Sequence, residues 1–128
     1  PIDENHPLNA QSPYAASKIA ADQICLSFHK SFNLPVTILR PFNTFGPRQS
    51  LRAVIPTILY QANKKHAVQL GNINSKRDFT FVDDTVNAFL LTLNKKKTIG
   101  EVINLGTGYE FSIKDVLNAT SKILKKKN

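Results

Sequence analysis

The first third of the chain has the hydrophobic pattern of an amphipathic helix. Ser12 is a good N-cap, and Pro13 suits the first helical position, where its missing N–H costs nothing. We expect the helix to run from Pro13 to about Phe32, ahead of Asn33 and Pro35. At about 100° per residue, one line along it carries Tyr14, Lys18, Ala21, Cys25, Phe28 and Phe32. We expect this stripe to face the core, with Cys25 as a small buried residue.

The rest of the chain alternates between strand-like and helix-like segments. The β-branched run 35–42 predicts a buried parallel strand, and 43–48 predicts a loop at its carboxyl end, where open α/β sheets bind ligands. Further along, we expect a helix over 51–65, strands near 68–70 and over 76–82, a helix through 93, a strand over 101–105, and a last helix opened by a capping box at Ser112–Asp115. This order indicates an α/β fold.

Composition adds a few limits. The 128 residues are 41% hydrophobic, enough for one domain with a sizeable core. No run of 18 apolar residues and no charged-then-apolar leader is visible, so we expect a cytoplasmic protein without a membrane partner. Because the sequence begins at Pro1 and contains no methionine, we also expect it to be part of a longer protein.

The formal net charge of +8 raises the alternative of nucleic-acid binding, which would weaken steeply with salt. Six of the seventeen basic residues, however, lie in two runs at 95–97 and 125–127, which follow helical patterns and are typical of solvated helix ends. We therefore expect no nucleic-acid partner. His6, His29 and His66 are far apart and Cys25 is the single cysteine, so we expect no metal site either.

Tyr14 and Lys18 are the candidate chemical pair. Residues four apart on a helix are neighbours, so the ammonium can favour the ionised phenol. Lowering a tyrosine pKa from about 10 by about three units takes about 4 kcal/mol, which a lysine and a cationic cofactor could supply together. Lys18 also lies on the stripe expected to face inward, where an unpaired ammonium is costly. The alternative is that Tyr14 packs in the core and Lys18 extends to solvent.

Four ordered motifs carry a resemblance to a known family. They are Tyr14-Ala-Ala-Ser-Lys18, Arg40-Pro-Phe-Asn43-Thr-Phe-Gly-Pro47, Arg77-Asp-Phe-Thr-Phe-Val-Asp83 and Asn104-Leu-Gly-Thr-Gly108. Together they resemble the extended short-chain dehydrogenase/reductase family, most of all its NAD-dependent sugar-nucleotide epimerases and dehydratases. Runs 11–18 and 40–50 look closest to the 4,6-dehydratases, including those that act on UDP-N-acetylglucosamine-type substrates.

The resemblance implies a fold and its division. It implies the carboxyl-terminal part of a Rossmann-like parallel sheet with a small α/β substrate-binding domain. Residues 1–50 would end the cofactor domain, truncated at its amino terminus. Residues 51–128 would mostly form the substrate-binding domain, with strand 101–105 returning to the main sheet.

The resemblance also implies roles for the residues that match the motifs. Tyr14 would be the general base on the sugar 4-hydroxyl while hydride leaves C4. Tyr14 and Lys18 would both contact NAD, and Lys18 would hold its nicotinamide ribose. Pro41 and Thr44 would lie beside the nicotinamide. The nucleotide-sugar contacts, with a UDP-sugar favoured, would come from Asn43, Arg77 and, as a weaker candidate, Arg48. An ion pair of Arg77 with Asp78 or Asp83 is the alternative.

Several family features are not in this sequence. The glycine-rich NAD turn, the serine or threonine that contacts the substrate hydroxyl, and the acid and base that expel water across C5 and C6 are missing. The chain alone should therefore hold NAD poorly.

The implied enzyme is a 4,6-dehydratase, a lyase, and a homodimer when full length. An epimerase, a decarboxylase and a non-catalytic nucleotide-sugar-binding fragment stay open. Asp83 and Asp84 could be an acid/base dyad, but helix caps are favoured.

Overall fold

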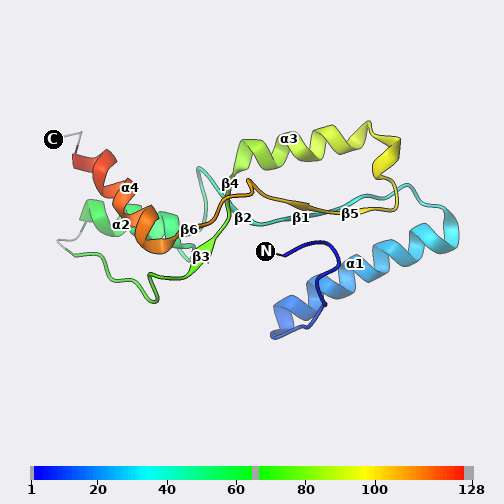
Figure 1. Cartoon of the computed structure of the whole chain (residues 1–128), viewed down its shortest axis with the longest axis horizontal. Helices are drawn as coiled ribbons and strands as arrows, with labels where there is room; N and C mark the ends of the chain where they lie inside the picture. Colours follow the sequence, from blue (N-terminus) through cyan, green and yellow to red (C-terminus); the bar gives the residue numbers. More distant parts are fainter. Residues whose placement is uncertain (1, 65–66, 126–128) are drawn as a thin grey trace. The chain divides into compact units, whose positions relative to one another are not determined.

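The computed structural model describes residues 2–64 and 67–125 (Figure 1). The expected helix end at 65, His66 and most of the lysine run 125–127 lie outside the described residues. The elements in chain order are α1 (Pro13–Phe32), β1 (Ile38–Pro41), β2 (Asn43–Phe45), α2 (Val54–Lys64), β3 (Lys76–Arg77), β4 (Phe79–Phe81), α3 (Val82–Leu93), the short 3₁₀ helix η1 (Lys96–Thr98), β5 (Val102–Leu105), β6 (Phe111–Ser112) and α4 (Ile113–Lys125). This confirms the α/β class.

Helix α1 has the bounds that the sequence predicts. The Ser12 hydroxyl oxygen accepts a hydrogen bond from the Ala15 amide at 3.1 Å, which satisfies one free N–H at the helix start. The helix ends at Asn33, which adopts the left-handed conformation at φ 53°. No helix in the described part of the chain is long and apolar enough to cross a membrane.

The expected inward face of α1 is wrong. The stripe from Tyr14 to Phe32 is exposed, Cys25 included. The half-buried residues lie about 100° further round the helix, at Ala15, Ile19, Asp22, Leu26 and His29. Two of these five are polar, and both find partners. The Asp22 carboxylate accepts from Arg40 Nε at 2.8 Å, and a nitrogen of His29 lies 2.8 Å from the Leu34 carbonyl oxygen.

Contacts divide the chain into two compact units. The first contains residues 1–41 and 85–105, and the second contains residues 42–84 and 106–128. In the first unit, β1 pairs in parallel with β5, from Ile38 opposite Val102 to Pro41 opposite Leu105. The parallel strand expected within 35–42 is therefore present, and the strand expected at 101–105 lies beside it. Which unit binds cofactor and which binds substrate stays a prediction.

The second unit contains two short strand pairs and two helices. β2 pairs in parallel with β4, and β3 pairs antiparallel with β6. Helices α2 and α4 pack side by side (Figure 1), with Ile58 fully buried in α2 and Ile113 buried at the start of α4. The expected capping box is present, since the Asp115 amide donates to the Ser112 hydroxyl oxygen at 3.1 Å and the Ser112 amide donates to the Asp115 carboxylate at 2.9 Å.

Three expectations in this unit are wrong in detail. Residues 43–45 are strand β2 rather than loop, because they pair with β4. The strand expected near 68–70 does not form, because the side chain of Gln61 takes up both backbone groups of Gln69, at 2.7 Å from its amide and 3.2 Å from its carbonyl oxygen. The strand expected over 76–82 is interrupted at Asp78 and gives way to α3 at Val82.

Gly100 shows how tightly the first unit closes around His29. Gly100 has φ +85°, and a Cβ there would meet His29 Nε2 at 2.5 Å. The His29 ring has little freedom to move, because its other nitrogen is held by the Leu34 carbonyl. Gly108 is a matched control, since its φ is also positive, at +80°, but no atom lies within 4 Å of its Cβ position.

We expect Gly100→Ala to lower the free energy of unfolding more than Gly108→Ala does. Each alanine suffers a backbone penalty of about 1–2 kcal/mol in the left-handed region. The His29 clash should add about 1–3 kcal/mol at Gly100. Denaturant titration followed by circular dichroism measures both variants. Equal losses would show that His29 yields freely.

Candidate active site

Tyr14 and Lys18 lie together on an exposed face of α1. The Lys18 ammonium is 5.6 Å from the centroid of the Tyr14 ring, within the range of a cation–π interaction. Tyr14 is 72% exposed, and within the described part of the chain its hydroxyl makes no hydrogen bond. Both the expected burial of Lys18 and the alternative of Tyr14 in the core are therefore wrong. What the structure offers is an accessible phenol with a cation beside it.

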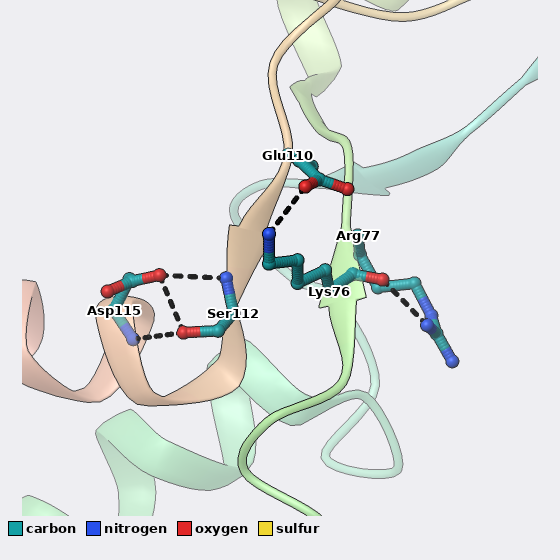
Figure 2. A network of polar contacts seen from close by, with 5 residues as sticks. All are labelled: Lys76, Arg77, Glu110, Ser112 and Asp115. Atoms are coloured by element: carbon teal, nitrogen blue, oxygen red, sulfur yellow. Dashed lines mark hydrogen bonds and ion pairs between the residues drawn. The ribbon is translucent and has the colours of Figure 1, made fainter. Parts of the chain in front are cut away.

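Arg77 is held on an exposed edge of the second unit. Figure 2 shows its side chain leaving β3 away from the ion pair that its neighbour Lys76 forms with Glu110 at 2.6 Å. The Arg77 guanidinium donates to the carbonyl oxygen of Lys76 at 2.7 Å. Among the described residues it forms no ion pair with Asp78 or Asp83, so that alternative is not realised. The hydrogen bond to Glu110 raises the pKa of Lys76.

Asn43 and Thr44 begin and continue strand β2. The Asn43 amide donates to the Asp78 carbonyl oxygen at 3.1 Å, while the Asn43 residue itself is exposed. Thr44 is half-buried, and its carbonyl accepts from the Gln49 side-chain amide at 2.8 Å. Pro41, at the end of β1, is exposed. The backbone around Asn43 is thus fixed while its surroundings stay open to solvent.

Arg48 has an unusual backbone. It lies in a turn closed by the Gln49 amide on the Gly46 carbonyl oxygen at 3.3 Å, and its φ is 66°. A left-handed conformation is uncommon for a residue with a long side chain, and strained residues cluster at functional sites. Arg48 remains a candidate ligand contact.

Asp78 is the residue that sequence reasoning missed. Its carboxylate accepts from the amides of Thr107 and Gly108, each at 2.9 Å, and from the Thr107 hydroxyl at 2.8 Å. Partial burial opposes ionisation of Asp78, but these bonds outweigh it and lower its pKa. The nearby Thr80 hydroxyl also favours the charged form, although it makes no well-aligned hydrogen bond among the described residues. The sequence held no signal for a partner 29 residues away.

The Asp78 contacts explain why the Gly-Thr-Gly turn at 106–108 is no dinucleotide cradle. Two N–H groups that could face a pyrophosphate already face this carboxylate. Asp83 and Asp84 lie in the first turn of α3, where negative charge suits the helix dipole, rather than at the N-cap. In the described ranges, no three histidine, cysteine, aspartate or glutamate side chains come close enough to hold a metal ion.

The predicted residues fall into two groups. Tyr14, Lys18 and Pro41 belong to the first unit. Asn43, Thr44, Arg48 and Arg77 belong to the second, where Asp78 joins the backbone of Asn43 to the segment bearing Arg77. A surface hollow of about 560 Å³ also lies in the first unit, between β1, α3 and η1, but none of the predicted residues lines it.

Comparison with known proteins decides the family. The model of the GDP-mannose 4,6-dehydratase family matches residues 1–128, the whole chain. The chain belongs to this family. The proteins similar to this chain include both sugar-nucleotide dehydratases and epimerases, which agrees with the resemblance carried by the four motifs.

Three relatives show how far the similarity of this family member extends. The dTDP-D-glucose 4,6-dehydratase of Dictyostelium discoideum is 40% identical over 116 residues, which is 89% of this chain and 26% of that protein. The structure of dTDP-glucose 4,6-dehydratase from Bacillus anthracis with NAD superposes with a TM-score of 0.89 at 33% identity, over 97% of this chain and 40% of that one. UDP-glucuronic acid 4-epimerase from Bacillus cereus, solved with UDP-glucuronic acid and NAD, gives 0.89 at 32%, over 97% and 40%.

The chain therefore spans between about a quarter and two fifths of the length of these relatives. The Rossmann-like character expected of the fold is confirmed by the two superpositions. Dehydratases and epimerases resemble this chain about equally closely, so the similarity does not choose between these two reactions.

Proposed function

We propose that this chain is the carboxyl-terminal part of an NAD-dependent sugar-nucleotide 4,6-dehydratase. Such an enzyme oxidises C4 by hydride transfer to NAD, removes water across C5 and C6, and returns the hydride to C6 and a proton to C5, which yields a 4-keto-6-deoxy sugar. The observation that carries the proposal is the exposed Tyr14 phenol with the Lys18 ammonium 5.6 Å from its ring, in a chain that matches the family over its full length. The chain covers 26% and 40% of two of its relatives, which supports the proposal that it acts as part of a longer protein.

Tyr14 is the proposed general base. Its accessible hydroxyl can approach a sugar 4-hydroxyl and take the proton as the C4–H bond breaks. Lys18 is the proposed partner of Tyr14, because its ammonium lies 5.6 Å from the centroid of the Tyr14 ring. Bound NAD supplies the hydride acceptor. Lys18 has three N–H donors, so it can bind a ribose hydroxyl while its charge remains beside the phenol.

The fit to NAD is partial. Lys18 fits the nicotinamide ribose, and we place Pro41 and Thr44 near the same end of the cofactor. The turn at 106–108 does not fit the pyrophosphate, because it directs its N–H groups at Asp78. We therefore expect this chain alone to bind NAD weakly.

Arg77 and Asn43 are the proposed nucleotide-sugar contacts. The Arg77 guanidinium uses one donor on the Lys76 carbonyl, and the remaining donors suit phosphate oxygens or ribose hydroxyls. Arg48 is a second phosphate candidate because its strained turn holds it on the surface of the same unit. We favour a UDP-sugar as substrate, and a cytoplasmic homodimer as the form of the full-length protein.

The mass of the product tests the reaction. The full-length protein would be incubated with NAD and, in turn, UDP-N-acetylglucosamine, dTDP-glucose and UDP-glucose, and the products analysed by mass spectrometry. A dehydratase gives a product lighter by one water molecule. An unchanged mass with a new sugar configuration would replace the proposal by the second candidate, a 4-epimerase, which the similarity to the Bacillus cereus enzyme supports.

If none of the nucleotide sugars is converted, both the dehydratase and the epimerase proposals are contradicted. Calorimetric titration of the same protein with UDP-N-acetylglucosamine then separates a non-catalytic binding module, which releases heat, from a protein that does not recognise nucleotide sugars. Bound nucleotide sugar without turnover would contradict the catalytic role given to Tyr14.

A further inference from the structure

We propose that Asp78 is a positioning residue, whose carboxylate fixes the 106–108 turn against β4 and so holds Asn43 and Arg77 in the geometry that binds the nucleotide sugar. This inference rests on the proposed function. It concerns a residue that touches neither substrate nor cofactor in that proposal, and acts through its neighbours in the chain and in the sheet.

The carboxylate of Asp78 uses both of its oxygens. One accepts from the Thr107 amide at 3.0 Å and from the Thr107 hydroxyl at 2.8 Å. The other accepts from the amides of Thr107 and Gly108, each at 2.9 Å. Every partner is a donor, so the site suits a negatively charged acceptor. An asparagine would turn an NH₂ group toward at least one donor, although it fills the same space.

The backbone of Asp78 is engaged at the same time. Its carbonyl accepts from the Asn43 amide at 3.1 Å, one step before the pairing of Asn43 with Phe79. Asp78 also interrupts the strand between β3, which ends at Arg77, and β4. One residue therefore links the two proposed substrate contacts to the turn.

Gly106 shows that the approach is close. A Cβ at this position would lie 2.6 Å from the second carboxylate oxygen of Asp78, and would also overlap the Phe42 ring. Only a residue without a side chain lets the turn come this near. Because Phe42 immediately precedes Asn43, the same contact region adjoins the start of β2.

The segment that follows the 106–108 turn also contacts β3, on the other side of Arg77 from Asp78. Lys76 pairs with Glu110, and Arg77 lies opposite Phe111 in the β3–β6 pairing (Figure 2). Arg77 is therefore flanked by two attachments of one segment. Asp78 is half-buried and its bonds to the exposed Thr107 and Gly108 are charge-assisted. Lys76 and Glu110 are exposed at 58% and 66%, where an ion pair stabilises little.

The acid dependence of the attachment follows from the charge. The lowered pKa means that Asp78 contributes stability above its ordinary value of 3.8, and loses it as the pH falls through the lower pKa of the folded state. Around neutral pH the attachment is fully formed, so it acts as a fixed part of the site and not as a switch.

Kinetics of the full-length protein test the inference. The variants are Asp78→Asn, Thr107→Val, which removes only the hydroxyl donor, and Thr107→Ser, which restores it. Glu110→Gln is the control, because it weakens the exposed pair and leaves the carboxylate of Asp78 untouched. KM and kcat would be measured with UDP-N-acetylglucosamine, and Kd by calorimetry.

We expect Asp78→Asn to raise KM and Kd about tenfold, the size expected for lost hydrogen bonds to a charged group, with a much smaller change in kcat. Thr107→Val should raise both less, and Thr107→Ser and Glu110→Gln should match the unsubstituted protein. Unchanged KM and Kd in Asp78→Asn, or a loss confined to kcat, would overturn the positioning role. If Asp78→Asn does not fold, unchanged KM in Thr107→Val overturns it instead.

The unsubstituted protein separates this inference from the proposed function. Failure to bind or convert the nucleotide sugar before any substitution overturns the proposed function, and the substrate-positioning role with it. Normal binding and turnover, with variants that bind equally well, overturns only the role of Asp78.

Discussion

Replacing Tyr14 by phenylalanine in the full-length protein is expected to lower kcat by about 10²–10⁴-fold, the usual contribution of a positioned acid or base. The ring and its contact with the Lys18 ammonium are kept, since a cation–π interaction needs only the aromatic face. Nucleotide-sugar affinity should therefore stay within about twofold, because the hydroxyl is proposed to act on the reacting hydrogen rather than to hold the ground state. Initial rates and calorimetric titration measure the two quantities.

Tyr109→Phe is the matched control. Tyr109 is 71% exposed, close to the 72% of Tyr14, but it lies in the second unit and has no proposed catalytic role. The same chemical change there should leave kcat unaltered. Full turnover in Tyr14→Phe would remove Tyr14 from the mechanism, and equal losses in both variants would point to a general effect on folding.

Gly106→Ala should cause a large loss of stability. The new methyl group would overlap the Phe42 ring and approach the Asp78 carboxylate at 2.6 Å. Moving Asp78 aside would relieve the steric overlap, but it would break the hydrogen bonds of Asp78 to Thr107 and Gly108. We expect a cost of about 3 kcal/mol or more, at the upper end for overpacking. Thermal and denaturant unfolding of the purified protein give the value.

Gly71→Ala provides the comparison for this variant. No atom lies within 4 Å of a Cβ placed at Gly71, and its φ is not in the left-handed region. An alanine there should be neutral or slightly stabilising, because it restricts the unfolded chain. Similar stability of Gly106→Ala and Gly71→Ala would show that the turn can retreat from Asp78, and would weaken the argument for its fixed position.

Local signals predicted the helices well. Ser12 and Pro13 marked the start of α1 and Asn33 its end, because capping depends on residues a few positions apart. The capping box of Ser112 and Asp115 did the same for α4. The apolar run before Pro41 likewise predicted a parallel strand, since parallel strands are buried on both faces.

The face of α1 could not be predicted from the helical pattern alone. The pattern treated apolar residues as buried, whereas the packed face includes Asp22 and His29, whose partners Arg40 and Leu34 come from the following segment. A polar residue becomes compatible with burial only when its partner is known. The same reasoning placed Lys18 inside, although it lies in the open beside Tyr14.

The candidate site was predicted as far as sequence motifs reach. They indicated Tyr14, Lys18, Asn43 and Arg77, and their roles stay predictions. The role of Asp78 was not predicted, because its hydrogen-bond partners lie in a turn 29 residues later in the chain. The split of strand 76–82 at Asp78 has the same origin, since pairing partners for β3 and β4 come from different parts of the chain.

The pairing of β1 with β5 bears on how the protein is made. The Thr37 hydroxyl, just before β1, donates to the Thr98 carbonyl oxygen, 61 residues later, and the two strands then run in parallel. During synthesis β1 leaves the ribosome well before β5 exists. Until then, the edge of β1 that pairs with β5 has no hydrogen-bond partner there, and the apolar residues around it are exposed. Parallel pairing over such a separation is slow, because the loop must close before any contact rewards it. Nascent chains halted between these strands should be the forms most dependent on chaperones.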